Sequence, residues 1–271
     1  LIPADPSHTY VPAFTLEPPK RAVERNAPAE FKTPRFIDDV AAGRVELPTI
    51  PRVVQQVIKA LRDPDVDARK LGELLSQDPV LSAKVLRVAN SSQFGGTRSM
   101  VSIDAAVARI GTKALGRLIV ACGVSGSFRS PPGITLPLFW RDALVAATAA
   151  HRLAAGVGAD PEEAYVCGLL HATGHLILCQ SYPEIAEAMF AGFEVVRGAE
   201  LAAIEVDAFG IDHAQAGALW VQSLGFPDGV ATTIGQSLRA PAAADAPLVL
   251  ALRGACGLVG AVARVDPAPA A

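Results

Sequence analysis

Two histidines lie four residues apart in an apolar stretch, and their types and spacing could do metal chemistry. His171 and His175 stand in a helix-compatible segment, and residues four apart lie on one face of an α-helix. Two imidazoles placed in this way are the arrangement that a bound metal ion needs. A hydrolytic site also requires a carboxylate, as a metal ligand or a general base. The residue after the first histidine is Ala172, so the segment has the outline of a metal hydrolase site without its acid.

Other catalytic chemistries have less support in the sequence. The glutamate of a His-Glu-x-x-His protease helix would fall at Ala172, so that motif is absent. The chain has neither a Gly-x-Ser-x-Gly elbow nor a glycine-rich phosphate loop. Its cysteines form no Cys-x-x-Cys pair, and we expect buried thiols in a reducing compartment. These cysteines are Cys122, Cys167, Cys179 and Cys256.

Composition favours a globular helical protein. Hydrophobic residues make up 51% of the 271 positions and aromatic residues only 6%, which favours helices packed through small side chains. The net charge of −3 gives no drive toward nucleic acid or a membrane surface, and we expect neither as a partner. The stretch 44–117 has 12 basic and 7 acidic residues, whereas the chain from 118 onward has 7 and 14. Either the helix surfaces differ by chance or two lobes have different partners.

The apolar periodicity predicts helices on both sides of a proline-rich boundary at 129–137. Before it, Asp67, Asp78-Pro79 and Ser102 are helix start signals. After it, we expect helices over 138–155, 161–181, 183–191, 197–206, 212–224, 227–239 and 247–264. The apolar run of the last helix is interrupted by Arg253, so it should not span a bilayer. With no signal peptide visible, we expect a cytoplasmic protein. Because the chain begins at Leu1 and not at Met, we expect a segment to precede it.

Several motifs together resemble the HDOD family. In the first half they are Leu47-Pro48-Thr49-Ile50-Pro51, the stretch from Asp78 to Ser92, and Val101 to Gly111. In the second half they are Phe139-Trp140, Gly168-Leu169-Leu170-His171, and Gly210-Ile211-Asp212-His213 leading to Gly217 and Trp220. The resemblance covers roughly 33–240.

The resemblance implies an all-α fold in which an N-terminal helical bundle packs on a C-terminal HD-like helical lobe. We divide the chain accordingly into a proline-rich arm (1–34), a bundle (35–130), an HD-like lobe (131–240), and a C-terminal helix with an Ala/Pro tail (241–271). HDOD modules are related to HD-type metal-dependent phosphohydrolases but are generally regulatory, and occur in bacterial signalling proteins beside receiver or cyclic-dinucleotide domains. The resemblance therefore implies a signal-transduction module, the output part of a response-regulator-type protein.

The HD pattern can be compared with this chain position by position. A catalytic relative would have histidine at Asp142, His-Asp at His171-Ala172, and histidine near Gln236-Ser237. We therefore expect no catalytic residue, cofactor or metal. One alternative is a degenerate phosphohydrolase that binds a divalent metal through Asp142, His171 and His213. A second is a module that senses a nucleotide without turning it over.

Each histidine also has a structural interpretation. Gly174 and its apolar neighbours indicate close helix packing, with His171 and His175 hydrogen-bonded inside. His213 follows Asp212 at a predicted helix start, which favours a capping or packing role. His151, three helical turns after Trp140, is expected to be structural.

A polar loop follows the helix that begins at Pro79. Asn90, Ser91 and Ser92 could terminate that helix by bonding its carbonyl groups. Alternatively, they form with Arg98 a partner surface, to which Lys84 and Arg87 would add positive charge. The partners implied by the family are receiver domains, kinases or cyclic-dinucleotide enzymes. An apolar surface on the C-terminal helix would indicate a homodimer.

Overall fold

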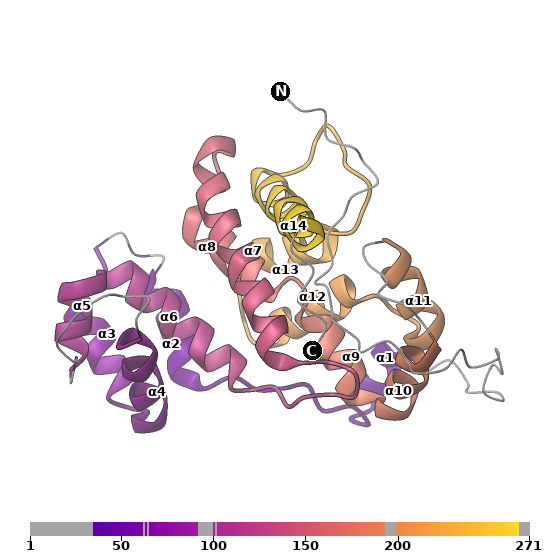
Figure 1. Ribbon diagram of the computed structural model, residues 1–271, viewed down its shortest axis with the longest axis horizontal. Coiled ribbons are helices and arrows are strands. Elements are labelled where there is room, and N and C mark those ends of the chain that lie inside the picture. Colours follow the sequence, from indigo (N-terminus) through magenta and orange to yellow (C-terminus); the bar gives the residue numbers. More distant parts are fainter. Residues whose placement is uncertain are drawn as a thin grey trace. The chain divides into compact units, whose positions relative to one another are not determined.

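The computed structural model describes residues 35–61, 63, 65–91, 100, 102–192 and 199–265. Every regular element in these residues is an α-helix, which confirms the predicted fold class (Figure 1). The helices form two compact units, one of residues 49–128 and one that combines residues up to 48 with those from 129 onward. The predicted arm at 1–34 lies outside the described residues. None of the helices in the described ranges is both long and apolar enough to cross a bilayer.

The unit of residues 49–128 contains α2 (Arg52–Leu61), α3 (Ala68–Leu75), α4 (Pro79–Ala89), α5 (Ile103–Ile110) and α6 (Thr112–Ser125). The predicted start signals act as N-caps: Asp67 accepts from Lys70 N–H at 2.8 Å and Asp78 from Leu81 N–H at 2.9 Å. The apolar stripe of α2 is buried as expected. Helices α2 and α6 approach closely because α6 has glycine at the contact. A Cβ atom on Gly123 would lie 2.1 Å from Val54 Cγ2.

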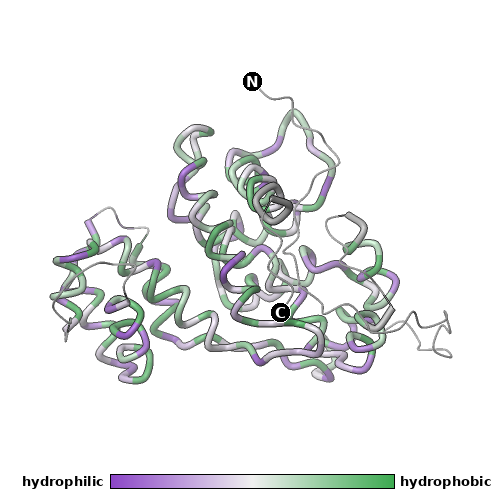
Figure 2. The backbone as a smooth tube through the Cα atoms, in the orientation of Figure 1, coloured by the Kyte–Doolittle hydropathy of each residue, from purple (hydrophilic) through white to green (hydrophobic). Residues whose placement is uncertain are grey.

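The other unit contains α1 (Phe36–Ala41), α7 (Leu136–Val157), α8 (Pro161–Leu170), α9 (Thr173–Ser181), α10 (Pro183–Gly192), α11 (Ala199–Phe209), α12 (His213–Ser223), α13 (Asp228–Gln236) and α14 (Pro247–Val265). Hydrophobic and hydrophilic residues alternate along the helices of both units (Figure 2), as expected for helices with one buried face. The long helix α7 packs against α8 and α14. Gly168 permits the first contact, because a Cβ atom there would lie 2.6 Å from Ala147 Cα.

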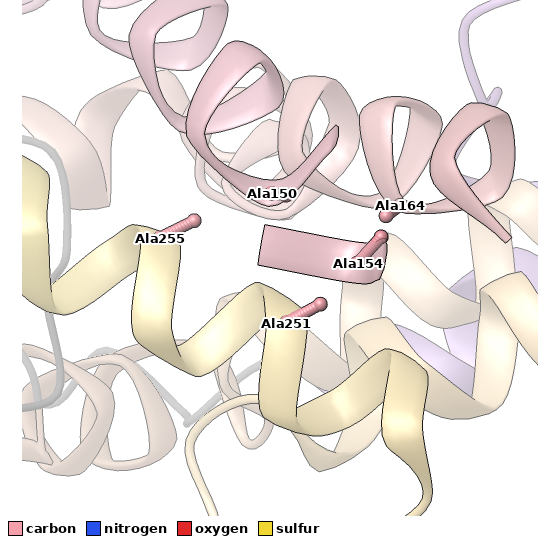
Figure 3. Packing of buried hydrophobic residues seen from close by; sticks show 5 residues of the cluster. All are labelled: Ala150, Ala154, Ala164, Ala251 and Ala255. Atoms are coloured by element: carbon pink, nitrogen blue, oxygen red, sulfur yellow. The ribbon is translucent and has the colours of Figure 1, made fainter. Parts of the chain in front are cut away.

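Alanine side chains fill the contact between α7, α8 and α14. Figure 3 shows this cluster, whose members are Ala150, Ala154, Ala164, Ala251 and Ala255. All of them are inaccessible to solvent. Small side chains let the helix axes come close, so the chain builds its core with few aromatic residues. This is the packing that the composition predicted.

The structure moves two of the predicted boundaries. Helix α1, assigned to the N-terminal bundle, instead belongs to the unit of the HD-like helices, because Phe36 contacts the ring of Tyr182 and the Tyr182 hydroxyl donates to Asp39 at 2.6 Å. Helix α14, assigned to a separate C-terminal segment, belongs to the same unit. Its Arg253 donates to the carbonyl oxygens of Gln236 and Ser237 at the end of α13 and pairs with Asp245.

The helix predicted over 161–181 is in fact two helices. α8 ends at Leu170 and α9 begins at Thr173, with a turn at His171-Ala172 between them. The N–H of His175 donates to the carbonyl of Ala172 at 3.0 Å, three residues back. The expectation that His171 and His175 share one helix face is therefore wrong, since His171 lies in the turn after α8 and His175 lies in α9.

Candidate functional site: a buried polar network

The side chain of His171 bonds to the helix that precedes it. Its Nδ1 atom lies 2.7 Å from the carbonyl oxygen of Gly168. Because a carbonyl only accepts, Nδ1 carries the proton and Nε2 has the lone pair. Burial lowers the pKa of His171 to about 4, although the bond to Gly168 opposes the shift and His213 adds to it. At neutral pH the side chain is therefore an uncharged, buried imidazole.

A second network joins three helices around a carboxylate that the sequence analysis did not single out. Glu205 of α11 is fully buried. Its Oε1 atom lies 2.5 Å from His175 Nδ1 of α9, and its Oε2 atom lies 2.5 Å from His213 Nδ1 of α12. The backbone N–H of His213 also donates to Oε2, at 2.9 Å. One carboxylate thus accepts three hydrogen bonds and connects α9, α11 and α12.

The electrostatics of this network favour an ionised carboxylate. Burial alone would raise the pKa of Glu205, but the charge of His213 and the hydrogen bonds from both histidines outweigh it and lower that pKa to about 2. Burial likewise opposes the charged form of His213, yet the charge and hydrogen bond of Glu205 raise the pKa of His213. Glu205 and His213 are therefore a buried ion pair, whose partners satisfy one another in place of water.

Cys179 extends the network without becoming a nucleophile. Its Sγ atom lies 3.8 Å from His175 Nε2, so thiol, imidazole and carboxylate follow one another as they do in cysteine hydrolases. However, burial raises the pKa of Cys179 well above its ordinary value, and Glu205 adds to that shift. Both Cys179 and His175 are inaccessible to solvent. The thiol is therefore protonated and closed to substrate, in keeping with the buried cysteines that we predicted.

Two glycines bring the histidine helices together. A Cβ atom on Gly174 of α9 would lie 1.9 Å from the carbonyl oxygen of His213 and 2.6 Å from the N atom of Gly217 in α12. This is the close packing that the sequence predicted around Gly174. His213 is the first residue of α12, where Asp212 and Gln215 form a reciprocal capping box. Its position at a helix start, with its ring turned into the interior, agrees with the expected packing role.

Sequence reasoning missed Glu205, although a signal was present. The inner face of α11 consists of Leu201, Glu205 and Phe209, which are spaced by four residues and are all buried. An acidic residue in the middle of an apolar stripe must find a partner inside the protein. The partners, however, come from α9 and α12, and the sequence did not indicate which helices would meet there.

The remaining candidate ligands do not complete a metal site. Asp142 is buried, and its Oδ1 atom forms an ion pair with Arg141 at 2.8 Å, whereas its Oδ2 atom has no hydrogen-bond partner among the described residues. The side chain of Ser237 donates to the carbonyl of Ile234. A histidine that is bonded through Nδ1 can still ligate a metal through Nε2. A catalytic zinc usually requires three protein ligands, so it would need Asp142, His171 and His213 together, because Ala172 offers none.

The described side chains are, however, not arranged as a metal site. Within the described ranges, no group of three or more His, Cys, Asp and Glu side chains is arranged to hold a metal ion. Two grooves, of about 650 and 580 Å³, open on the surface, one beside α2 and α3 and the other beside α12 and α13. Neither is lined by Asp142, His171 or His213. The residues present therefore do not fit the metal centre of an HD-type phosphohydrolase.

The backbone after α4 bonds the helix carbonyl groups, as one of the two expectations had it: the N–H of Asn90 donates to Leu86 at 2.9 Å, and the N–H of Ser91 donates to Val88 at 3.0 Å. The Asn90 side chain donates to the carbonyl of Met100 at 2.8 Å and accepts from its N–H at 2.6 Å. The side-chain amide therefore joins the two ends of the loop, and the Asn90 residue itself remains exposed. Lys84 is also occupied, because its Nζ atom donates to the carbonyl of Cys122 at the end of α6. Ser91 is exposed, while Ser92 and Arg98 lie outside the described residues.

Trp220, a motif residue, and His151, expected to be structural, both contact other parts of their unit. The Trp220 Nε1–H donates to the carbonyl of Pro48 at 2.6 Å, across 172 positions of sequence. His151 lies 3.5 Å from Glu162, so it contacts α8 from α7 as a structural side chain. Many of the recognisable positions therefore maintain helix packing.

Comparison with known families matches residues 47–238 to the HDOD domain. One curated relative, an uncharacterized protein of Treponema pallidum (strain Nichols), is 26% identical over 217 residues. These residues are 79% of this chain and 42% of the relative, so the chain spans less than half of that protein.

Solved structures show the same fold. A candidate phosphohydrolase from Shewanella amazonensis SB2B is 28% identical with a TM-score of 0.66, over 88% of this chain and 83% of its own. A candidate signal transduction protein from Marinobacter aquaeolei VT8 is 25% identical with a TM-score of 0.67, over 87% and 52%. An HDOD domain protein of unknown function from Geobacter sulfurreducens, at 22% identity and a TM-score of 0.67, covers 88% and 80% and supports the fold alone.

Proposed function

This chain belongs to the HDOD domain family, and we propose that it is a non-catalytic signal-transduction module that acts through contacts with other proteins. The observation that carries the proposal is the arrangement of the candidate ligands, because within the described ranges no group of three or more His, Cys, Asp and Glu side chains could hold a metal ion. His213 pairs with Glu205, His171 bonds the Gly168 carbonyl, and Asp142 pairs with Arg141. Three positions of the HD pattern have lost the residue that catalysis needs, whereas the scaffold around them is well packed.

The similarity to a candidate signal transduction protein supports the same assignment. On this view the chain is the output part of a response-regulator-type protein, with a receiver domain as its input. Kinases and cyclic-dinucleotide enzymes are the partner classes that the family implies. The resemblance to a candidate phosphohydrolase favours the rival activity, whereas aspartate at 142 and alanine at 172 support the non-catalytic assignment.

Phosphoester turnover is the direct test. The purified chain, without an affinity tag, would be assayed with bis(p-nitrophenyl) phosphate in the presence of Mn²⁺, Fe²⁺, Ni²⁺ or Zn²⁺, beside the His171→Ala variant. We expect both proteins to give the rate of the metal solution alone, and His151→Ala serves as a matched histidine control. Turnover that His171→Ala abolishes and His151→Ala retains would refute the non-catalytic assignment.

A binding experiment tests directly whether the chain contacts other signalling proteins. The chain would be immobilised and exposed separately to purified receiver domains, histidine kinases and cyclic-dinucleotide enzymes, with bovine serum albumin as the control. We expect saturable binding to one class only. A nucleotide that raises the melting temperature, with no protein bound, would instead favour the sensing alternative, because a ligand of the native state stabilises it.

A further inference from the structure

Helix α14 has an exposed face without polar side chains. Its buried face consists of Ala251, Ala255 and their neighbours, which pack on α7 (Figure 3). On the other side, Leu250 is 44% exposed and Leu258 is 53% exposed, and Gly254 between them is also exposed. The solvent side of a surface helix ordinarily carries charged and polar residues. Leu250 and Leu258 lie on the same i±4 ridge of α14 and together leave apolar surface exposed to water.

The same face is electrically neutral. Between residues 247 and 260 the only charged side chain is Arg253, and its guanidinium is turned inward to Asp245 and the carbonyl groups at the end of α13. The side chain of Arg253 is 13% exposed. A chain with a net charge of −3 would repel a second copy at a typical acidic surface. At this face, two copies would bring no like charges together.

The spacing on this face is symmetric. Leu250 and Leu258 stand four residues before and four residues after Gly254. A two-fold axis at Gly254 would therefore place Leu250 of one copy against Leu258 of the other, twice, with the two glycines facing each other. A two-fold contact of this kind needs a surface that is complementary to itself. Because Gly254 has no side chain, the two helices can approach each other closely at the axis. Leu153 of α7 adds apolar surface beside it, 3.1 Å from the position of a Gly254 Cβ atom.

We propose that two copies of this chain associate through α14, with the helices antiparallel and Gly254 at the two-fold axis. The occupant of the face is thus a second copy, and the contact depends on the Leu250–Leu258 pairing. The two leucines are about 12 Å apart along the helix, so the contact is small and the dimer is weak and concentration-dependent. This inference does not rest on the proposed function, because it uses the surface alone.

Charge substitution at the two leucines tests the antiparallel pairing. In Leu250→Glu/Leu258→Glu, every glutamate faces a glutamate of the other copy. In Leu250→Glu/Leu258→Lys, the antiparallel arrangement places each glutamate against a lysine, whereas a parallel arrangement would pair like charges. Val80→Glu is the matched control, since Val80 is 80% exposed and lies in the other unit.

Sedimentation equilibrium would be measured from about 1 to about 100 µM, the range of weak association. We expect the wild type and Val80→Glu to shift from monomer to dimer. The Glu/Glu variant should raise the dissociation constant at least about tenfold, and the Glu/Lys variant should restore dimerisation. Circular dichroism would verify that each variant keeps its helix content.

Three outcomes would overturn the inference: a monomeric wild type at the highest concentration, a Glu/Glu variant that still dimerises, or a Glu/Lys variant that behaves like Glu/Glu. None of them bears on phosphoester turnover or on partner binding by the monomer.

Discussion

Glu205 and His213 share two hydrogen bonds at a single carboxylate oxygen. The Oε2 atom of Glu205 accepts from the imidazole Nδ1 of His213 at 2.5 Å and from its backbone N–H at 2.9 Å. Because the other oxygen contacts His175, the side chain of Glu205 holds α11 against two helices at once. A buried charge that serves as the common partner of two imidazoles is costly to remove, since its partners remain in an environment without water.

Neutralising that carboxylate should destabilise the protein. We expect Glu205→Gln to lower the free energy of unfolding by about 3–5 kcal/mol, the usual cost of breaking a buried ion pair. The matched control is Glu187→Gln, an exposed site on α10, which should change stability by less than about 0.5 kcal/mol. Urea unfolding followed by circular dichroism measures both. Equal effects of the two substitutions would show that Glu205 is not the centre of the network.

The contribution of the ion pair should depend on pH in both directions. The pKa of Glu205 is lowered from 4.5, so its stabilisation is present above pH 4.5 and lost as pH falls toward about 2. The pKa of His213 is raised from 6.5, so its stabilisation is present below pH 6.5 and lost as pH rises through the raised value. The coupling in a Glu205→Gln and His213→Gln double-mutant cycle should therefore be largest between pH 4.5 and 6.5. A coupling energy that is constant across this range and on both sides of it would contradict the assignment.

His171 should make the protein sensitive to mild acid. Its pKa is lowered from 6.5 to about 4, so the unfolded chain binds a proton in that interval that the folded chain does not. Stability therefore decreases as pH falls from 6.5 to about 4, by about 3 kcal/mol from this residue. His171→Asn retains a donor toward Gly168 but does not titrate, so its stability curve should be flatter over this interval. Parallel curves for the wild type and the variant would exclude His171 as the source.

Two glycine-to-alanine substitutions should have opposite effects. Gly174→Ala places a methyl group 1.9 Å from the His213 carbonyl and forces α9 and α12 apart, so we expect a loss of several kcal/mol, of the order seen for overpacked cores. Gly156 lies in α7 with no atom within 4 Å of the added methyl group. Gly156→Ala should therefore raise stability by about 0.5–1 kcal/mol, through helix propensity. Thermal melts distinguish them, and a loss in both would mean that helix contact is not the cause.

Asn90 should act as a loop clamp. We expect Asn90→Ala to cost about 1–2 kcal/mol of stability, because it removes both hydrogen bonds to Met100. Ser91→Ala, at the adjacent exposed position, is the control and should be close to neutral. Urea unfolding and the rate of cleavage by trypsin provide two readouts. If Asn90→Ala changes partner binding while leaving stability and cleavage unchanged, the clamp assignment is wrong and the partner-surface interpretation is favoured.

The sequence indicated the fold and many helix ends because these depend on local signals. Asp67 and Asp78 cap the helices that they were expected to begin, since an N-cap bond reaches only three residues along the chain. The low content of aromatic residues likewise predicted helices packed through small side chains, as in the alanine contact between α7 and α14. The family motifs then gave the topology that local signals do not specify.

The polar centre was only partly predictable because its contacts are long-range. His175 of α9 and Glu205 of α11 are 30 residues apart in the sequence, and their contact depends on how these two helices meet. The break at His171-Ala172 was missed because both residues are compatible with a helix and no glycine or proline marks the turn. The Asn90–Met100 contact spans ten residues, and nothing in the loop sequence indicated that its two ends would bond to each other through one amide.

The contacts that Arg253 and the alanine face of α14 make have a consequence for any fragment of this protein that lacks the last helix. The matched family region ends at residue 238, before the helix that covers α7 and caps α13. A fragment that ended at residue 238 would expose Ala150 and Ala154 as an apolar surface prone to aggregation. The last carbonyl groups of α13 would then bond to water and not to Arg253. We therefore expect the unit that folds stably by itself to extend through α14, beyond the region that the family motifs match.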